Sequence, residues 1–228
     1  MKVRKNILKM SKIFAVSQRV KEAVGRVYYN DITITQNAPF RPEKHIDSIK
    51  TEILFIGRLN ESKGIKNVIK MLQILDLKNA HFTIHGGAEF DSEYQDKIKE
   101  LSDASDSIDL ISEPLPRSEI IQLFKKADIF YFPSRLEGGP LVVLEALSAG
   151  CAVVTTPVGM VPQIIKEGFN GFICEFDDIE KQKQILQNLI NDRSLLNKIK
   201  GNTLKTILPT WDETAGIMYG EYKELMRR

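Results

Sequence analysis

Apolar segments of strand length alternate with segments of helical periodicity over most of the chain. Each short apolar run precedes a stretch in which apolar residues recur every three or four positions, as on one face of a helix. The predicted strands lie at 52–57, 80–85, 108–111, 128–133, 152–156 and 171–174, and the predicted helices at 64–77, 91–101, 117–127, 140–149, 161–167, 178–191, 192–200 and 210–226. Strands that are largely apolar and separated by helices predict an α/β fold with a parallel sheet covered on both faces. We therefore expect a Rossmann-like doubly wound sheet, with ligands bound beyond the carboxyl ends of its strands.

The first 49 residues do not continue this alternation. Residues 12–17 and 31–36 are predicted strands, a short helix is expected from Gln18 towards Val24, and the proline-bearing stretch 37–42 is typical of a linker. Residues 1–10 carry four basic residues among apolar ones, which fits either a solvated end or a surface that touches anionic lipid or a partner. The predicted division is 1–49 as a remnant of another domain with its linker, and 50–228 as the main domain.

Composition and charge narrow the class of protein. The 228 residues are 43% hydrophobic and 27% charged, with 32 basic and 30 acidic residues and a formal charge of +2. This balance is typical of a globular protein and speaks against a dedicated nucleic-acid binder. Cys151 and Cys174 lie in apolar runs and are expected to be buried thiols in a reducing compartment. No apolar run approaches the roughly 20 residues of a membrane span, so we expect a cytoplasmic protein, with contact to the inner face of the membrane as an option.

The stretch 134–150 carries the most informative pattern in the chain. A strand end leads into Gly138 and Gly139, and a helix is expected to open at Pro140 and to stop at Gly150. The N–H groups at such a helix start are a natural seat for an anion. Glu137 and Glu145 lie on either side of this seat, eight residues apart. Their carboxylates suit hydroxyls attached to an anion, and a sugar nucleotide has that shape.

Glu137 and Glu145 also have simpler interpretations, as a turn residue and an exposed helix residue. Helical spacing, however, places Glu145 on one face with Leu141, Val142 and Ala149. An unpaired carboxylate on a largely apolar face is costly. This cost favours a function for Glu145.

Other strand-end loops add candidate ligand-binding residues. In the loop 57–64, Arg58 and Lys63 would neutralise a diphosphate or would be solvated loop residues, and Ser62 is a candidate helix cap. Gly86 and Gly87 allow either close approach by a ligand or a plain turn, and the proline-bearing loop with Glu113 forms either a wall of a base pocket or a connector. The loop 57–64 lacks the spacing of a Walker A loop. The three histidines lack metal-ligand spacing, so no metal is expected.

These residues together resemble the family-4 (group 1) retaining glycosyltransferases. The resemblance rests on Glu137-x7-Glu145, on Gly57-Arg58-Leu59 with Lys63-Gly64, and on Trp211 with Tyr219 or Tyr222 in the last helix, and it covers about 50–228. It implies one half of a GT-B fold, the half that binds the nucleotide-sugar donor without a catalytic metal or other cofactor.

The resemblance also implies a role for each site residue. Glu137 would touch the transferred sugar, Glu145 would accept hydrogen bonds from the ribose, and Arg58 and Lys63 would hold the diphosphate. The remaining donor-binding candidates are Gly138, Gly139, Pro140, Leu141, Val142, Gly87 and Glu113. The implied reaction retains anomeric configuration through front-face attack within an ion pair. It transfers a hexose-type sugar to a glycan or lipid acceptor, as in polysaccharide biosynthesis.

Two departures from the family pattern change the expectation. The chain has Gly159-Met160 where members usually carry Gly-Gly, which alters the expected sugar pocket. The acceptor-binding domain is also not recognisable in the sequence, so an acceptor-domain partner in trans is a further expectation. Two alternatives remain: a non-catalytic regulatory or scaffolding subunit that keeps the fold, and an NAD-dependent dehydrogenase, for which the sequence lacks Gly-x-Gly-x-x-Gly after its first strand.

Overall fold

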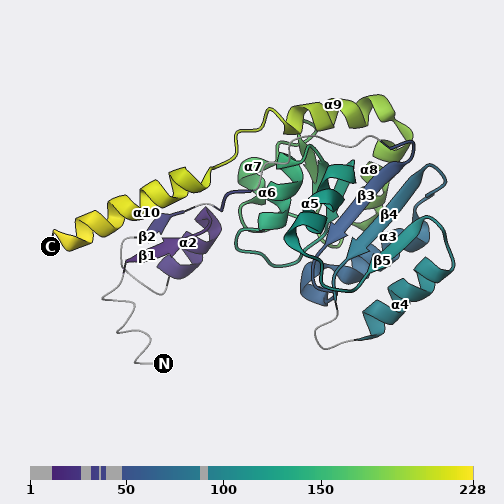
Figure 1. Cartoon of the computed structure of the whole chain (residues 1–228), viewed down its shortest axis with the longest axis horizontal. Coiled ribbons are helices and arrows are strands. Elements are labelled where there is room, and N and C mark those ends of the chain that lie inside the picture. The colour runs from purple at the N-terminus through teal and green to yellow at the C-terminus, as the bar shows by residue number, and fades with distance from the viewer. Residues whose placement is uncertain (1–11, 27–31, 36, 40–47, 88–91, 228) are drawn as a thin grey trace.

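The computed structural model describes residues 12–26, 32–35, 37–39, 48–87 and 92–227. Within them, six parallel strands form the main sheet in the order β5-β4-β3-β6-β7-β8. The strands are β3 (Thr51–Ile56), β4 (Ala80–His85), β5 (Ile108–Ile111), β6 (Ile129–Phe132), β7 (Ala152–Thr155) and β8 (Gly171–Ile173). Each lies within one residue of its predicted bounds. The expected α/β fold is confirmed (Figure 1).

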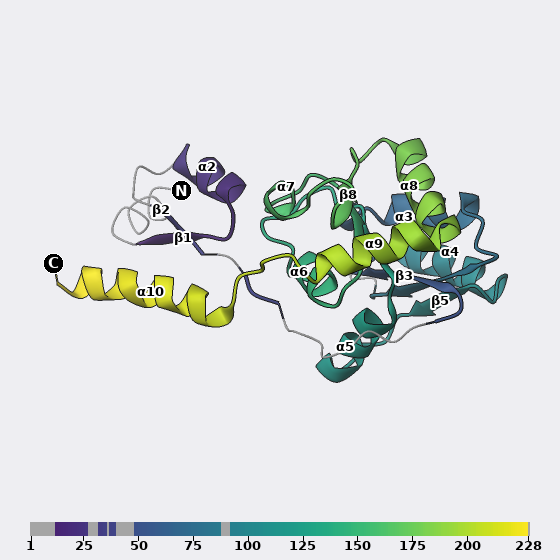
Figure 2. The same ribbon diagram turned by 90° about the horizontal axis from the view of Figure 1, so that it is seen from above.

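Helices cover both faces of this sheet. They are α3 (Ile65–Ile74), α4 (Ser92–Asp103), α5 (Arg117–Lys126), α6 (Leu141–Ser148), α7 (Val161–Ile164), α8 (Ile179–Asn191) and α9 (Arg193–Thr203). Figure 2 shows α5 on one side of the sheet and α3 and α8 on the other. The chain runs outward from β3 to β4 and β5, returns through α5 to β6, and then runs outward the other way. The sheet is therefore doubly wound, with its switch point between β3 and β6.

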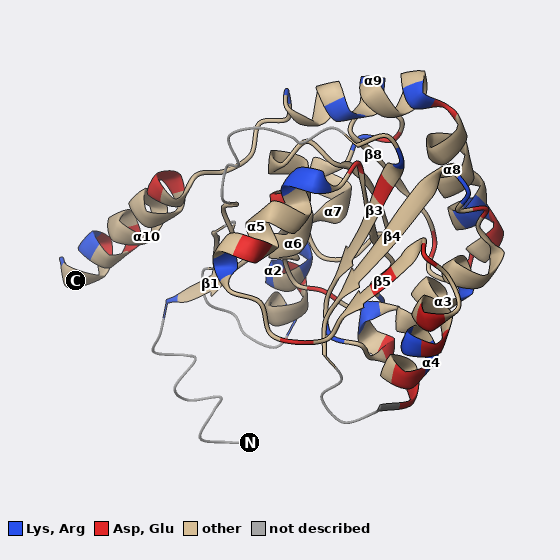
Figure 3. Cartoon of the chain, turned by 45° about the vertical axis from the view of Figure 1, so that its right-hand side comes forward, with Lys and Arg blue, Asp and Glu red and all other residues tan. Residues whose placement is uncertain are grey.

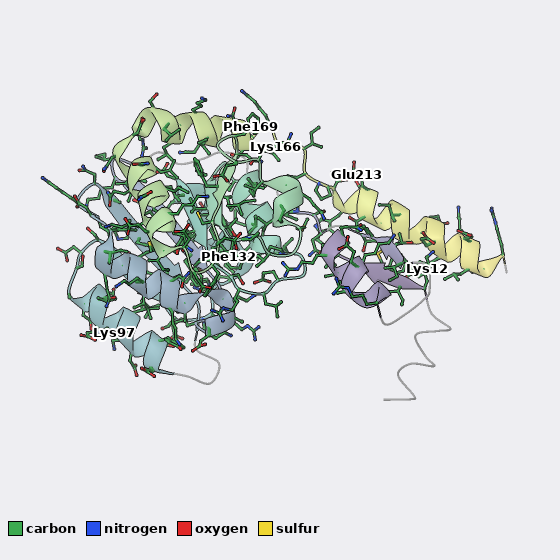
Figure 4. All side chains as sticks on the ribbon, turned by 180° about the vertical axis from the view of Figure 1, so that it is seen from behind. Lys12, Lys97, Phe132, Lys166, Phe169 and Glu213 are labelled. Carbon is green, nitrogen blue, oxygen red and sulfur yellow. The ribbon has the colours of Figure 1, made fainter. Side chains whose placement is uncertain are left out.

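The core is built from strands that are buried on both faces. Every residue of β6 and β7 is buried, which explains why these strands are apolar rather than alternating in sequence. Phe130 and Phe132 stack with ring centroids 5.7 Å apart, and Phe55 stacks on Phe132 at 6.3 Å. Figure 4 places Phe132 in the middle of the large domain and Lys97 at its outer edge. These aromatic contacts fix the strands whose ends carry the candidate site.

A small second unit contains the first described residues. Strands β1 (Ile13–Ala15) and β2 (Ile32–Ile34) pair in parallel, and helix α2 (Gln18–Gly25) starts at Ser17, whose hydroxyl accepts a hydrogen bond from the amide of Val20 at 3.2 Å. The basic residues 1–10, for which a solvated end or a lipid contact was expected, lie outside the described residues. The predicted boundary at 49/50 stays a prediction.

Helix α10 (Trp211–Met226) leaves the large sheet and packs on this small unit. Lys12 pairs with Glu221 at 2.5 Å, the Thr33 hydroxyl donates to Glu221 at 2.6 Å, and Phe14 meets Tyr222 edge to face. Figures 1 and 4 show the helix extending beyond the large domain, with Lys12 beneath it. The two ends of the described chain are thereby joined in one unit.

Some predicted element ends are wrong by one to three residues. A short 3₁₀ helix, η1 (Glu61–Lys63), precedes α3, and Asn60 rather than Ser62 caps it by accepting from the Lys63 amide at 3.2 Å. Pro140 precedes α6 instead of opening it, because its ψ of 101° is extended. Gly150 does follow α6 in the left-handed region expected of it, with φ of 86°.

The distribution of surface charge and the burial of the two cysteines agree with what the composition predicts. Acidic and basic residues are interspersed along α3 and α4 (Figure 3). Both cysteines are buried free thiols as expected, and burial raises the pKa of Cys174 to about 11. Among the described residues, no helix combines the length and the hydrophobicity that crossing a membrane requires.

Candidate functional site

The candidate site lies at the switch point of the sheet. Strands β3 and β6 are neighbours there, with Ile53 opposite Ile129. The loops that follow them, 57–64 and 133–140, leave the same edge of the sheet, because the two strands are parallel. In doubly wound sheets, ligands bind in the crevice outside this edge. The sequence placed its strongest candidates in these two loops.

Lys63 and Glu137 form an ion pair that joins the two loops. The Lys63 ammonium lies 2.5 Å from Glu137 Oε1, and the two side chains are 19% and 12% exposed. The hydroxyl of buried Ser134 lies 2.8 Å from the same carboxylate oxygen and 2.9 Å from the carbonyl of Ser62. The predicted diphosphate cation and the predicted sugar-binding glutamate are therefore brought together.

Glycine and a cap hold Lys63 in position. Asn60 accepts both the Lys63 amide at 3.2 Å and the Ser62 hydroxyl at 2.8 Å, which closes the 3₁₀ turn. Gly64 follows in the left-handed region with φ of 75°, and a Cβ there would stand 1.8 Å from the backbone oxygen of Pro133. The loop after β3 therefore lies directly against the loop after β6, and this contact leaves no room for a side chain at position 64.

Arg58 and Gly87 lie at neighbouring strand ends. Arg58 is exposed, while the next residue, Leu59, is buried and its amide donates to the carbonyl of Gly87 at 3.2 Å. A Cβ on Gly86 would lie 1.9 Å from the oxygen of Gly57, so these two loops also approach closely. The structure thus brings both predicted loops to one edge, with Arg58 facing solvent.

Glu145 is buried in α6 and paired with a residue that the sequence did not single out. Its exposed fraction is 2%, and Arg117, the first residue of α5, donates to its carboxylate. Burial raises the pKa of Glu145, while the hydrogen bond and charge of Arg117 act to lower it. The simpler interpretation of Glu145 as an exposed helix residue is therefore wrong. No local sequence signal identifies Arg117, which is 28 residues away.

The glycine turn lies against the small unit. A Cβ on Gly139 would come within 3.3 Å of Val16, and one on Gly138 within 3.4 Å of Val20. The Asn37 side chain donates to the carbonyl of Gly139 at 3.1 Å. Residues of the predicted N-terminal remnant therefore close one side of the turn at which an anion seat was expected.

Met160, which departs from the family pattern, is buried beside the same turn. Its exposed fraction is 0%, and its sulfur lies 3.4 Å from where a Gly139 Cβ would be. The preceding Gly159 has φ of 52°, and a Cβ there would lie 2.5 Å from the carbonyl of Gly138. Met160 therefore packs against the glycine turn.

A buried polar network fixes a further loop near the site. Gln182 of α8 accepts from the Tyr131 hydroxyl at 2.5 Å and donates to the carbonyls of Glu175 and Phe176 at 2.8 and 3.0 Å. Burial raises the pKa of Tyr131 well above its usual value. The Arg135 guanidinium then lies 4.2 Å from the ring centroid of Phe176. This network was not predicted from the sequence, because its members come from β6, α8 and the loop after β8.

The remaining predicted site residues differ in their exposure. Glu113 and Gly87 are exposed, Pro140 is buried, and Leu141 and Val142 are half-buried in the first turn of α6. Their expected contacts with a ligand stay predictions. Within the described residues, no group of three or more His, Cys, Asp or Glu could hold a metal ion.

Comparison with known proteins was consistent with the resemblance. Residues 36–206 match the sequence model of the family described as glycosyl transferases group 1. An uncharacterised glycosyltransferase of Haemophilus influenzae is 30% identical over 171 residues, which cover 73% of this chain and 47% of that protein. The chain spans about half the length of the first two curated relatives that it matches.

Solved structures share the fold at lower identity. A glycosyltransferase from Rickettsia africae superposes with a TM-score of 0.83 at 20% identity, covering 97% of this chain and 65% of that one. An Anabaena protein in complex with UDP and glucose superposes with a TM-score of 0.73 at 20% identity, covering 90% and 60%. At these identities the structural comparison establishes the GT-B-type fold alone.

Proposed function

The chain belongs to the group 1 glycosyl transferases, and we propose that it forms the half of such an enzyme that binds a nucleotide-sugar donor. The observation that carries this proposal is the ion pair of Lys63 and Glu137 at the switch point of the sheet. A cation and a carboxylate held 2.5 Å apart can serve two adjoining parts of one ligand, its anionic and its hydroxylated part. A sugar diphosphate has these parts side by side.

In this proposal, the diphosphate is bound by cations from one loop and by amides from the other. Lys63 turns from Glu137 towards the diphosphate, and exposed Arg58 approaches from the same loop. The N–H groups of Leu141 and Val142, which have no intrahelical acceptors, complete the seat. Negative charge grows on the diphosphate as it departs, so these groups stabilise departure electrostatically.

Glu137 and Glu145 would bind the two sugars of the donor. Glu137 accepts from hydroxyls of the transferred hexose once Lys63 has moved to the phosphate. Glu145, four residues beyond Leu141, accepts from the ribose. The acceptor would attack from the face that the diphosphate leaves, within an ion pair, which retains the anomeric configuration. No metal or other cofactor enters this scheme.

The acceptor would be bound with the help of a further α/β part. That part belongs either to the same longer polypeptide or to a separate chain, and it would contact α10. Large apolar side chains on α10 support this assignment, since Trp211, Tyr219 and Met226 are 56%, 59% and 77% exposed. The same surface favours the second candidate function, a regulatory or scaffolding subunit that retains the fold.

Nucleotide binding separates the two candidate functions. UDP, GDP, ADP and their glucose conjugates are titrated by calorimetry and by thermal unfolding. A ligand at 100 times its Kd contributes about 2.7 kcal/mol, which raises the melting temperature by about 5–11 °C at ~2–4 °C per kcal/mol. Lys63→Ala should weaken binding of the diphosphate about tenfold or more, as expected for a lost charge-assisted contact. The control is Lys97→Ala, at the outer edge of the large domain, which should leave the affinity for the diphosphate unchanged (Figure 4).

Glu137→Gln tests the sugar end of the proposal. It should leave the affinity for the free nucleotide within about twofold and remove the extra affinity contributed by the glucose moiety. Retention is tested by NMR of the anomeric proton in the product, with the acceptor-binding part present. Absence of binding for every nucleotide would refute the transferase proposal and leave the scaffolding function.

A further inference from the structure

Glu145 is a buried carboxylate with a single basic partner among the described residues. It is 2% exposed and lies on α6 between apolar neighbours, Leu144 and Ala146, which are both fully buried. Arg117 reaches it from α5 and is itself 54% exposed at its side chain. An ionised carboxylate in such surroundings is unfavourable unless a cation or hydrogen-bond donors compensate it.

The position of Arg117 is not explained by the stability of its own helix. Arg117 is the first residue of α5, where the positive end of the helix dipole disfavours a cation. The basic residues that suit the dipole are Lys125 and Lys126 in the last turn. Two prolines, Pro114 and Pro116, stiffen the loop that delivers Arg117. The loop therefore presents a guanidinium at the start of α5, where it donates to the carboxylate on α6.

We propose that Arg117 is a positioning residue that holds the Glu145 carboxylate ionised and oriented for the two hydroxyls of a nucleotide's ribose. This inference rests on the proposed donor-binding function. A carboxylate has about four acceptor sites, so one guanidinium N–H leaves room for two ribose hydroxyls. Arg117 itself need not touch the nucleotide.

A selectivity follows from this arrangement. An ionised Glu145 accepts from both the 2′- and the 3′-hydroxyl, whereas a protonated one keeps one oxygen as a donor. Without Arg117, burial would act unopposed and the pKa of Glu145 would rise further. Loss of Arg117 should therefore reduce the preference for ribose over 2′-deoxyribose, and raising the pH should restore it.

The test compares ribonucleoside and 2′-deoxyribonucleoside diphosphates. UDP, GDP, ADP and their 2′-deoxy forms are titrated by calorimetry between pH 5 and 9, against wild type, Arg117→Met, Arg117→Lys and Glu145→Gln. The matched control is Lys126→Met, which removes an exposed cation from the other end of the same helix. Thermal unfolding of each variant reports its folding separately from its binding.

The expected result is a loss of ribose preference that depends on charge and pH. In Arg117→Met, affinity for the ribonucleotide falls about tenfold near pH 7, the ratio to the deoxy form approaches one, and both recover at high pH. Arg117→Lys retains most of the preference for the ribonucleotide over its 2′-deoxy form, and Lys126→Met retains all of it. Glu145→Gln loses this preference at every pH. If Arg117→Met does not fold, Arg117→Lys and Glu145→Gln carry the test through their opposite effects on the ratio.

Other outcomes overturn the inference. An unchanged ratio in Arg117→Met would show that Glu145 does not depend on Arg117. Tighter nucleotide binding in that variant would show that Arg117 competes with the ribose for the carboxylate. Absence of any nucleotide binding by wild type is a different result, because it rejects the donor site itself.

Discussion

Asp128 is predicted to contribute more to stability than any single surface charge, and Asp128→Ala tests this directly. The carboxylate is fully buried immediately before β6. It accepts from the Glu52 amide at 3.0 Å, and it pairs with Lys200 at 2.5 Å and Arg193 at 3.3 Å. Both cations come from α9, so Asp128 ties that helix to the amino end of the sheet.

The magnitude follows from what the substitution leaves behind. Lys200 is 11% exposed at its side chain and would keep a buried charge without its carboxylate partner. Breaking a buried ion pair in this way costs about 3–5 kcal/mol. For a chain of this size that is a fall in melting temperature of ~6–20 °C. It is also a large part of a typical total stability of about 5–15 kcal/mol.

The assay is urea unfolding followed by circular dichroism, with thermal unfolding as a second measure. The control is Glu100→Ala, which removes an exposed ion pair with Lys97 and should cost less than about 1 kcal/mol. The double variant Asp128→Leu/Lys200→Met should regain much of the loss, since an apolar pair replaces both charges. If Asp128→Ala costs no more than Glu100→Ala, the structural role assigned to the cluster is wrong.

Two further predictions concern backbone strain and pH. Gly64→Ala should cost at least about 2 kcal/mol in urea unfolding, because it combines φ of 75° with a backbone clash, whereas Gly201→Ala, where a Cβ meets nothing within 4 Å, should be neutral or stabilising. The pKa of His81 is raised, first by its hydrogen bond with Glu52 and also by Asp109, against burial. Protonated His81 should thus stabilise the fold by less than about 1 kcal/mol at pH values below its unfolded pKa of about 6.5. This stabilisation should be lost as the pH rises through the folded pKa of His81. A difference in unfolding free energy between wild type and His81→Gln that increases with pH would contradict this prediction.

The fold was predictable because each strand of the main sheet is recognisable from its local sequence pattern. A run such as 129–132 is buried at all four positions, so burial alone dictates an apolar sequence there. The approach of Lys63 to Glu137 was predictable too, although they are 74 residues apart. Both lie in loops at carboxyl ends of strands, and parallel strands bring such loops to one edge. The order of parallel strands therefore predicts this contact between residues that are distant in the sequence.

The pairing of Arg117 with Glu145 was not predictable by the same reasoning. It depends on the side-chain contact between α5 and α6, whose detail the strand order does not fix. The cluster of Asp128 has the same character, because Arg193 and Lys200 lie on α9, 65 and 72 residues further along. In the sequence, Asp128 is a polar residue at the start of a strand and nothing more. Helix packing, not sheet order, decides these contacts.

The buried carboxylates at the two ends of the sheet have different hydrogen-bond partners, and this difference supports the proposed donor site. At the amino end, Asp128 is held by a backbone amide and two cations, which leaves little capacity for a ligand. At the carboxyl end, Glu145 has one basic partner among the described residues and keeps acceptor sites to spare. Burying a carboxylate without satisfying it fully is unfavourable for the fold alone. That cost is understandable if hydroxyls of a bound nucleotide supply the missing hydrogen bonds.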